Sequence, residues 1–259
     1  MNKMELEEKN PTSDFTIEPI KTAKHNIPQR KCQKQGILPK FPFSIGLIGR
    51  SGAGKTCCLL NILTRETMLK NYFNYILVYS PTCDIDDSFK SLKIPKENFV
   101  KKFDEDALEN ILLARKRLIK KRGIKWVAEH SRVLIILDDI ICESKFMRSP
   151  STLKMFVLLR HYLCSVIICS QSLTKIPRAI RLNCNALIIF PSTQSEVEVM
   201  KDELRPVSLT RSEFQKLVEY ATEDQFSFLY FNEHAGKGKK IRKNLDEIID
   251  IAQFKSSKK

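Results

Sequence analysis

The chain has 259 residues and a formal charge of +14, from 44 lysines and arginines against 30 acidic residues. This length allows one large α/β domain with a substantial core and does not require two. The charge favours a polyanionic partner such as nucleic acid. The sequence has no run of 18 apolar residues and no apolar signal core after Met1, so we expect a soluble intracellular protein without a membrane partner.

Residues 1–40 differ in composition from the rest of the chain. They are polar and charged, carry Pro11, Pro19 and Pro28, and show no sustained apolar period. Such a segment is expected to be a flexible or loosely docked N-terminal arm. From Phe41 onward, apolar runs alternate with helical stretches, as in a parallel sheet covered by helices. We therefore expect one domain over residues 41–259, with a basic C-terminal segment from about residue 232.

The first element pair of this domain encloses a phosphate-binding motif. The sequence GRSGAGKT fills the pattern GxxxxGK[ST] between a strand expected at 43–48 and a helix expected from Cys57. Its backbone N–H groups are expected to surround the phosphates of ATP, with Lys55 on the β and γ phosphates and Thr56 on Mg²⁺. A glycine-rich turn that matches by chance is the alternative. The motif consists of Gly49, Arg50, Ser51, Gly52, Ala53, Gly54, Lys55 and Thr56.

Further strands and helices follow in alternation. Helix starts are indicated by Asp104, by Ser149-Pro150, and by the capping box that begins at Thr210. The first of these helices is expected to end near Arg122 and the second near Leu163. Short runs rich in Ile, Val, Leu and aromatic residues predict strands at 75–79, 133–137, 165–169, 186–190 and 226–231.

Acidic and amide side chains follow two of the predicted strands. Asp138 ends an apolar strand and is expected to hold Mg²⁺, whereas Asp139 points elsewhere and is a candidate general base. A pair of turn-forming acids is the alternative. Gln171 follows the next strand and is a candidate sensor of the γ phosphate or holder of the attacking water.

Several cations are candidates for contacts with anions. Arg160, Arg178 and Arg181 are candidates for stabilising transition-state charge, and a neighbouring subunit can supply such an arginine. Each also has a non-catalytic alternative: Arg160, for example, can simply be a favourable positive charge at the C-terminal end of a helix. Two basic clusters are candidate DNA contacts, with a solvated surface as the alternative. The first cluster spans residues 115–125 and the second residues 237–243. The candidate contacts are Arg115, Lys116, Arg117, Lys120 and Lys121 in the first, and Lys239 and Lys240 in the second.

The spacing of these motifs resembles a known family. The segments GRSGAGKT (49–56), YILVYSP (75–81), LIILDD (134–139), LLRH (158–161) and VIICSQ (166–171) are similar to those of genome-packaging ATPases of large cytoplasmic DNA viruses and virophages. Those proteins belong to the FtsK-HerA superfamily of P-loop NTPases.

The resemblance implies an α/β, additional-strand, three-layer sandwich with a mainly parallel central sheet. It also implies a homo-oligomeric ring that uses ATP and Mg²⁺ to move double-stranded DNA into a preformed capsid in the host cytoplasm, with capsid or portal proteins as partners. In that family, the positions matching Lys55, Thr56, Asp138, Asp139 and Gln171 serve as loop, magnesium, base and sensor residues. The trans arginine has no unambiguous match here.

Two other functions remain open at this point. A helicase or another DNA-transfer ATPase would use the same core, and strand separation on forked DNA would distinguish it. A basic DNA-binding or scaffold protein would bind nucleotide for regulation and show negligible turnover.

Overall fold

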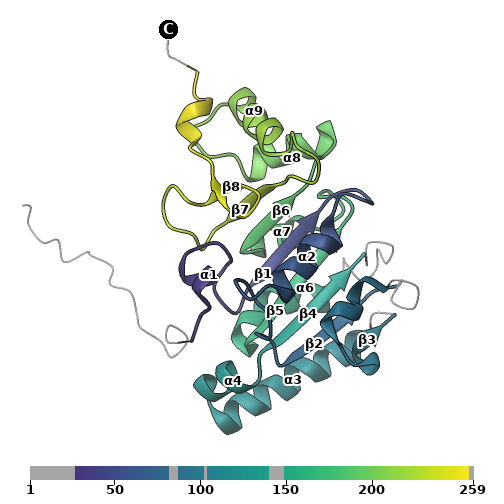
Figure 1. Ribbon diagram of the computed structural model, residues 1–259. Coiled ribbons are helices and arrows are strands. Elements are labelled where there is room, and N and C mark those ends of the chain that lie inside the picture. The colour runs from purple at the N-terminus through teal and green to yellow at the C-terminus, as the bar shows by residue number, and fades with distance from the viewer. Residues whose placement is uncertain (1–26, 82–86, 102–103, 140–148, 257–259) are drawn as a thin grey trace, which may run out of the picture.

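The central element of the fold is one large sheet. The computed structural model describes residues 27–81, 87–101, 104–139 and 149–256. Within these ranges a nine-stranded sheet has the order β3-β2-β4-β5-β1-β6-β7-β8-β9 (Figure 1). Its strands are β1 (Ser44–Ile48), β2 (Tyr75–Tyr79), β3 (Phe99–Val100), β4 (Val133–Asp138), β5 (Cys164–Ser170), β6 (Ala186–Ile189), β7 (Leu229–Asn232), β8 (Ile241–Lys243) and β9 (Glu247–Ile248).

The sheet is parallel from β3 to β6 and antiparallel from β6 to β9. Strand β5 lies between β1 and β4, with Ile45 beside Ile167 and Ile136 beside the same residue on the other side. All parallel strands therefore end at one edge, which we call the carboxyl edge, and begin at the opposite edge, the amino edge. The mainly parallel sheet with an additional strand between β1 and β4 is confirmed.

Helices cover both faces of the sheet and make three layers. One face packs against α1 (Lys31–Lys34), α2 (Lys55–Thr64), α4 (Ile124–His130) and the short 3-10 helix η2 (Asp87–Leu92). The other packs against α3 (Glu105–Arg122), α6 (Pro150–Leu158), α7 (Arg178–Asn183), α8 (Gln194–Glu203) and α9 (Arg211–Ala221). The remaining short helices are η3 (Lys96–Asn98), η5 (Leu159–Tyr162) and η6 (Ile251–Phe254).

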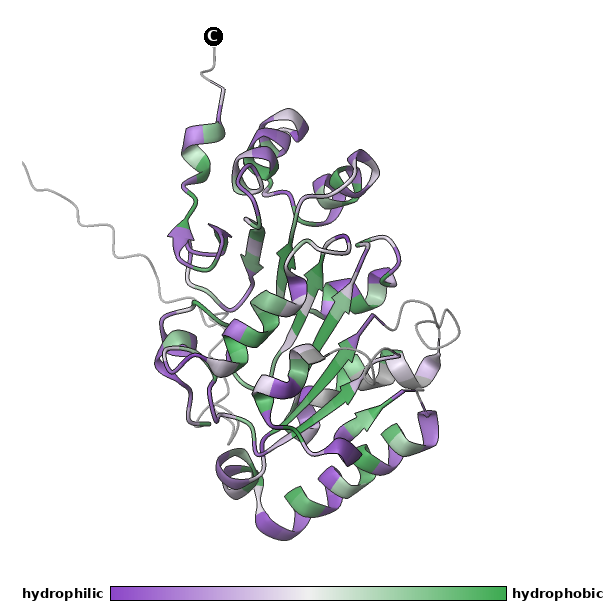
Figure 2. Cartoon of the chain, turned by 45° about the vertical axis from the view of Figure 1, so that its right-hand side comes forward, coloured by the Kyte–Doolittle hydropathy of each residue, from purple (hydrophilic) through white to green (hydrophobic). Residues whose placement is uncertain are grey.

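Residue alternation along the strands supplies the two cores. Ile135 and Leu137 of β4 point into the core beneath α3 and α6, whereas Leu134 and Ile136 point into the core beneath α2. Because both faces are covered, the central strands are mostly apolar between their ends, as Figure 2 shows. This arrangement leaves the ends of the strands as the places where polar groups can gather.

The predicted helix starts are confirmed. The Asp104 carboxylate accepts a hydrogen bond from the Asp106 N–H at 2.9 Å, and Thr210 and Glu213 form the expected capping box of α9. The helix from Pro150 is shorter than predicted. It ends at Leu158, and η5 tightens the chain before Leu163, whose φ of 55° turns it into β5.

The segment before residue 41 is docked where the structure describes it. Ile27, Cys32 and Leu38 are buried in the core beneath α2. The Tyr230 hydroxyl donates to the Ile37 carbonyl at 2.8 Å. The boundary expected at residue 40 therefore does not separate an arm from the domain, and packing extends back to residue 27. Residues 1–26 of the expected arm lie outside the described ranges.

The C-terminal part of the sheet differs from the sequence prediction. The strand predicted at 226–231 begins only at Leu229, because Phe226 has a φ of 64° that is incompatible with an extended strand. Strands β3, β8 and β9 were not predicted, since they are only two or three residues long. Among the described helices, none has the length and apolar character needed to cross a membrane.

Candidate functional site

The loop between β1 and α2 has the tight geometry that its glycines predict. A Cβ atom on Gly49 would lie 2.7 Å from the Cβ of Phe190, so only glycine fits there. Gly54 has a φ of 101° and forms the N-cap of α2. This left-handed conformation is readily adopted by glycine and directs the chain into the helix, whose first N–H groups then face the loop.

Lys55 lies across this loop. Its Nζ donates to the carbonyl oxygens of Gly49 at 2.7 Å and of Arg50 at 3.0 Å. An ammonium group thus stands beside the positive end of α2, and both favour a bound anion. The loop is also bonded to β5, the neighbouring strand in the sheet, because the Gly49 N–H donates to the Ser170 carbonyl at 3.0 Å.

The two aspartates predicted from the sequence reach the same edge of the sheet. Asp138 ends β4 and is 7% exposed, whereas Asp139 follows with a φ of 50°. Asp138 lies beside Cys169 in the β4–β5 ladder. Burial, and then the nearby Asp138 carboxylate, raise the pKa of the Cys169 thiol well above its ordinary value, so the thiol stays protonated.

Gln171 holds Asp139 directly. Its Nε2 donates to both carboxylate oxygens, at 3.0 Å to Oδ1 and 2.8 Å to Oδ2. The left-handed backbone of Asp139 turns its side chain away from that of Asp138, and such strained positions often occur at functional sites. The two residues that sequence analysis placed one strand apart are therefore in contact.

A cavity of about 320 Å³ joins these groups. It is lined by residues of the phosphate loop, by Cys57, and by Asp138, Asp139 and Gln171. Thr56 and Asp138 both line it and offer a hydroxyl and a carboxylate oxygen, the ligand types that Mg²⁺ prefers. The donor set present therefore fits a magnesium ion beside a polyphosphate.

Comparison with known proteins places the chain in a family. Residues 31–227 match the family described as Poxvirus A32 protein. The chain belongs to this family. Its start at residue 31 agrees with the docked segment before residue 41, which includes α1.

Curated relatives of this poxvirus A32 family member are DNA packaging proteins. The chain is 29% identical over 179 residues to DNA packaging protein OPG160 of monkeypox virus, with 68% of this chain and 56% of the relative covered. The same protein of vaccinia virus (strain Copenhagen) is 28% identical, with 68% and 63% covered. The chain thus spans less than two thirds of the length of these relatives.

A solved structure has the same fold. The genome packaging NTPase B204 of Sulfolobus turreted icosahedral virus 2, in complex with AMP, superposes with a TM-score of 0.55 at 15% identity. The match covers 78% of this chain and 96% of B204. The predicted P-loop α/β architecture is therefore confirmed.

The three arginine candidates differ in position and in partners. Arg160 is exposed in η5, before the start of β5, whereas Gln171 follows the end of the same strand. Arg181 has a structural role, because its Nη2 lies 2.6 Å from Glu203 Oε1 and its Nε donates to Oε2 at 2.8 Å. Arg178 also contacts Glu203, with Nε 3.4 Å from Oε1. A role for Arg160 in a neighbouring subunit stays a prediction.

The prediction of DNA contacts in the first basic cluster is wrong for one residue. Arg115 is 5% exposed and donates to the Tyr162 carbonyl at 3.2 Å, the Leu163 carbonyl at 3.1 Å and the Ser131 hydroxyl at 2.7 Å. It therefore ties α3 to the start of β5 and is not available to DNA. The other four candidate contacts, Lys116, Arg117, Lys120 and Lys121, are exposed.

An aromatic side chain that the sequence prediction did not use lies directly after this cluster. The Arg122 guanidinium lies 5.2 Å from the centre of the Trp126 ring, which stacks on His130 at 5.0 Å. The cluster lies at the end of α3 and in α4, just before β4 begins, so it belongs to the amino edge.

Several cations of the second basic cluster are buried or paired with acidic residues, which the sequence prediction did not foresee. Arg242 and Lys243 are buried in β8, and Lys243 pairs with Glu223 and Asp224 at 2.6 Å each. Of the predicted DNA contacts, Lys240 is exposed but lies 2.6 Å from Glu233, and Lys239 is exposed. Acidic partners thus neutralise much of this cluster.

Sequence analysis missed a second cavity beside the phosphate loop. Phe226 and Phe228 were assigned to a strand, yet with Phe190 they line a hollow next to Gly54. The signal available in the sequence was the pair of phenylalanines two residues apart near a strand end. Their position beside the loop follows only from the antiparallel return of β7.

Proposed function

We propose that this chain is an ATP-hydrolysing motor that translocates double-stranded DNA and packages a viral genome into a preformed capsid. The family membership of the chain and the identity of its relatives as DNA packaging proteins support this proposal. The motor would work as a homo-oligomeric ring in the host cytoplasm, with capsid or portal proteins as partners. The net charge of +14 suits a DNA substrate.

The observation that carries the proposal is the contact between Gln171 and Asp139 at the mouth of the phosphate loop. The Gln171 amide nitrogen donates to both carboxylate oxygens of Asp139, in a cavity shared with Lys55 and Thr56. This carboxylate is therefore arranged for proton transfer next to a polyphosphate. A regulatory nucleotide site needs the loop but has no use for this acceptor.

Each residue of the site then has a distinct task. The loop N–H groups and Lys55 bind the phosphates, and Thr56 and Asp138 would hold Mg²⁺. The ion, when bound, neutralises charge that develops on the phosphates. Asp139 accepts the proton of the attacking water at a carboxylate oxygen. Gln171 fixes the orientation of that carboxylate and can report the state of the γ phosphate to β5.

The test is the rate of ATP hydrolysis by the purified full chain with and without duplex DNA. We expect turnover that duplex DNA stimulates, with little stimulation by the same mass of single-stranded DNA. Nucleotide binding without turnover under both conditions would contradict the motor and support the scaffold function. Efficient ATP-dependent strand separation on forked DNA, without translocation on plain duplex, would instead indicate a helicase.

A further inference from the structure

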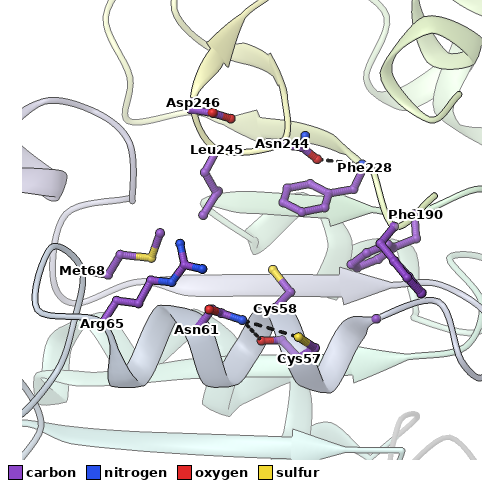
Figure 3. A pocket seen from close by; sticks show the side chains of 12 residues that line it. Cys57, Cys58, Asn61, Arg65, Met68, Phe190, Phe228, Asn244, Leu245 and Asp246 are labelled. Atoms are coloured by element: carbon purple, nitrogen blue, oxygen red, sulfur yellow. Dashed lines mark hydrogen bonds between the residues drawn. The ribbon is translucent and has the colours of Figure 1, made fainter. Parts of the chain in front are cut away.

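A second cavity adjoins the phosphate site along α2. It has a volume of about 450 Å³ and lies between α2 and the chain around β7 and β8 (Figure 3). Gly54 and Cys57 line both this cavity and the phosphate cavity. A ligand whose phosphates occupy the loop would therefore have its remaining part at the entrance of the second cavity.

Much of the wall of this cavity is aromatic or apolar, and Arg65 and Asp246 add one charged group of each sign. Phe190 and Phe228 are 1% and 8% exposed, with ring centres 5.1 Å apart. Cys58 and Leu245 face each other from α2 and from the chain after β8 in Figure 3. Burial, and then Cys57, raise the pKa of the Cys58 thiol to about 12, so this thiol is uncharged near neutral pH. Pockets with these properties suit flat apolar rings.

Phe226 stands out because it is exposed beside the loop. It is 58% exposed, and a Cβ atom on Gly54 would lie only 3.4 Å from its Cδ1. Its φ of 64° is rarely adopted by a bulky residue. A strained backbone that holds a large ring open to solvent, at the junction of two cavities, is costly to stability unless the ring serves a ligand.

Two asparagines give the cavity a polar side. Asn61 Nδ2 donates to the Cys57 carbonyl at 2.8 Å and to its Sγ at 3.4 Å. Asn244 Oδ1 accepts from the Phe228 N–H at 3.2 Å. Within the described residues, the Asn61 oxygen and the Asn244 amide nitrogen make no further hydrogen bond. One acceptor and one donor therefore remain, which match the amino group and ring nitrogen at the edge of a base.

A third hollow beside the loop fits such a ring less well. It has a volume of about 420 Å³ and is lined by residues 50–53 and 222–226. Glu223 and Asp224, which line it, are exposed carboxylates. The two carboxylates share one cation, Lys243, so the pair keeps a net negative charge beside the polyphosphate. This hollow also adjoins the phosphate cavity, through Ser51 and Gly52, but Phe226 is the one aromatic residue among those that line it.

We infer that the aromatic cavity between α2 and the β7–β8 region binds the base of the nucleoside triphosphate, with Phe226 as an exposed stacking platform. This inference rests on the proposed function, since it assumes that the loop binds the phosphates of the same molecule. It makes Phe226 and Leu245 binding residues with no part in the chemical step.

The test compares a ligand that has a base with one that lacks it. Binding of AMPPCP and of inorganic tripolyphosphate, each with Mg²⁺, is measured by calorimetry on the full chain and on Phe226→Ala. The exposed ring can be removed with little loss of stability. We expect AMPPCP affinity to fall about tenfold, because a stacked ring contributes on this scale, and tripolyphosphate affinity to stay unchanged. Val207→Ala, at a fully exposed site, is the matched control.

A second variant addresses the opposite wall. Leu245→Ala removes an apolar side chain from the chain after β8, and we expect the same selective loss of AMPPCP affinity, about threefold to tenfold. AMPPCP that binds the unaltered chain no tighter than tripolyphosphate, or that is unaffected by either variant, would overturn the base pocket while leaving the phosphate site intact. Failure of the unaltered chain to bind either ligand would overturn the proposed function as well.

Discussion

The carboxyl and amino edges of the sheet both gather charged residues, but for different reasons. At the carboxyl edge, Lys55, Asp139 and Gln171 line one cavity and make only light contributions to packing. At the amino edge, Arg115 is buried by hydrogen bonds to the chain around β5, while its neighbour Lys116 is exposed. A charged residue in a basic run can therefore have a structural role, so its place in a run does not by itself make it a binding residue.

The largest effect is expected at the carboxyl edge. Lys55→Ala removes the ammonium group that reaches across the loop, and we expect ATP turnover to fall about 100- to 1000-fold. The free energy of unfolding should stay close to that of the unaltered chain, because Lys55 is part of a surface loop and donates to the carbonyls of Gly49 and Arg50. Steady-state hydrolysis and urea denaturation measure the two quantities. Lys216→Ala, at an exposed site on α9, is the control.

The opposite pattern is expected at the amino edge. Arg115→Ala leaves the buried carbonyls of Tyr162 and Leu163 without their donor, and we expect the free energy of unfolding to fall by about 3 kcal/mol. Urea denaturation measures the change. Lys116→Ala should change it by no more than about 0.5 kcal/mol. Equal stability of the two variants would contradict the structural role of Arg115.

The exposed part of the first basic cluster can be tested for DNA binding apart from Arg115. Replacing its four exposed candidate contacts by alanine should weaken duplex binding. The plot of log affinity against log salt concentration should also become flatter, by about 0.9 in slope for each phosphate that the variant no longer neutralises. An unchanged slope would assign them to a solvated surface. The changed residues are Lys116, Arg117, Lys120 and Lys121. A control with an equal change in charge replaces Lys34, Lys93, Lys96 and Lys216, which are exposed elsewhere.

A smaller effect, on the pH dependence of stability, is expected for Glu213, whose carboxylate has a structural role, unlike the proposed catalytic carboxylate of Asp139. Hydrogen bonds from the backbone of Thr210, and then from the Ser256 N–H, lower the pKa of Glu213 from its ordinary value of 4.5 to about 2. A pKa that is lower in the folded state contributes stability above pH 4.5 that is lost as the pH falls towards 2. In Glu213→Gln, stability should therefore fall less steeply across this range. Urea midpoints at several pH values measure it, and an unchanged pH dependence would contradict the assignment.

The sequence was sufficient for the carboxyl edge because strand direction determines where strand ends meet. Asp138 and Gln171 each follow an apolar run, and parallel strands bring such ends together without any knowledge of distant contacts. The phosphate loop required only its own glycines. The magnesium, base and sensor roles of these residues stay predictions until variants are measured.

Other features depended on long-range packing. Arg115 shares the buried face of α3 with Leu108 and Leu112, a helical spacing that was visible in the sequence but outweighed by the run of cations around it. Ile27 and Leu38 are among the few apolar residues of a polar segment, and their burial depends on contacts with the distant β7 and α2 regions. The conformation of Phe226 likewise follows from the fold around β7.

The measurement that tests the central claim most directly is the comparison of ATP binding and ATP turnover in Asp139→Asn. Asparagine keeps the size of the side chain but cannot accept the proton. We predict nucleotide affinity close to that of the unaltered chain and turnover lower by about 100- to 10,000-fold, with Asp106→Asn unchanged in both. Turnover equal to that of the unaltered chain in Asp139→Asn would contradict the claim that this edge of the sheet hydrolyses ATP.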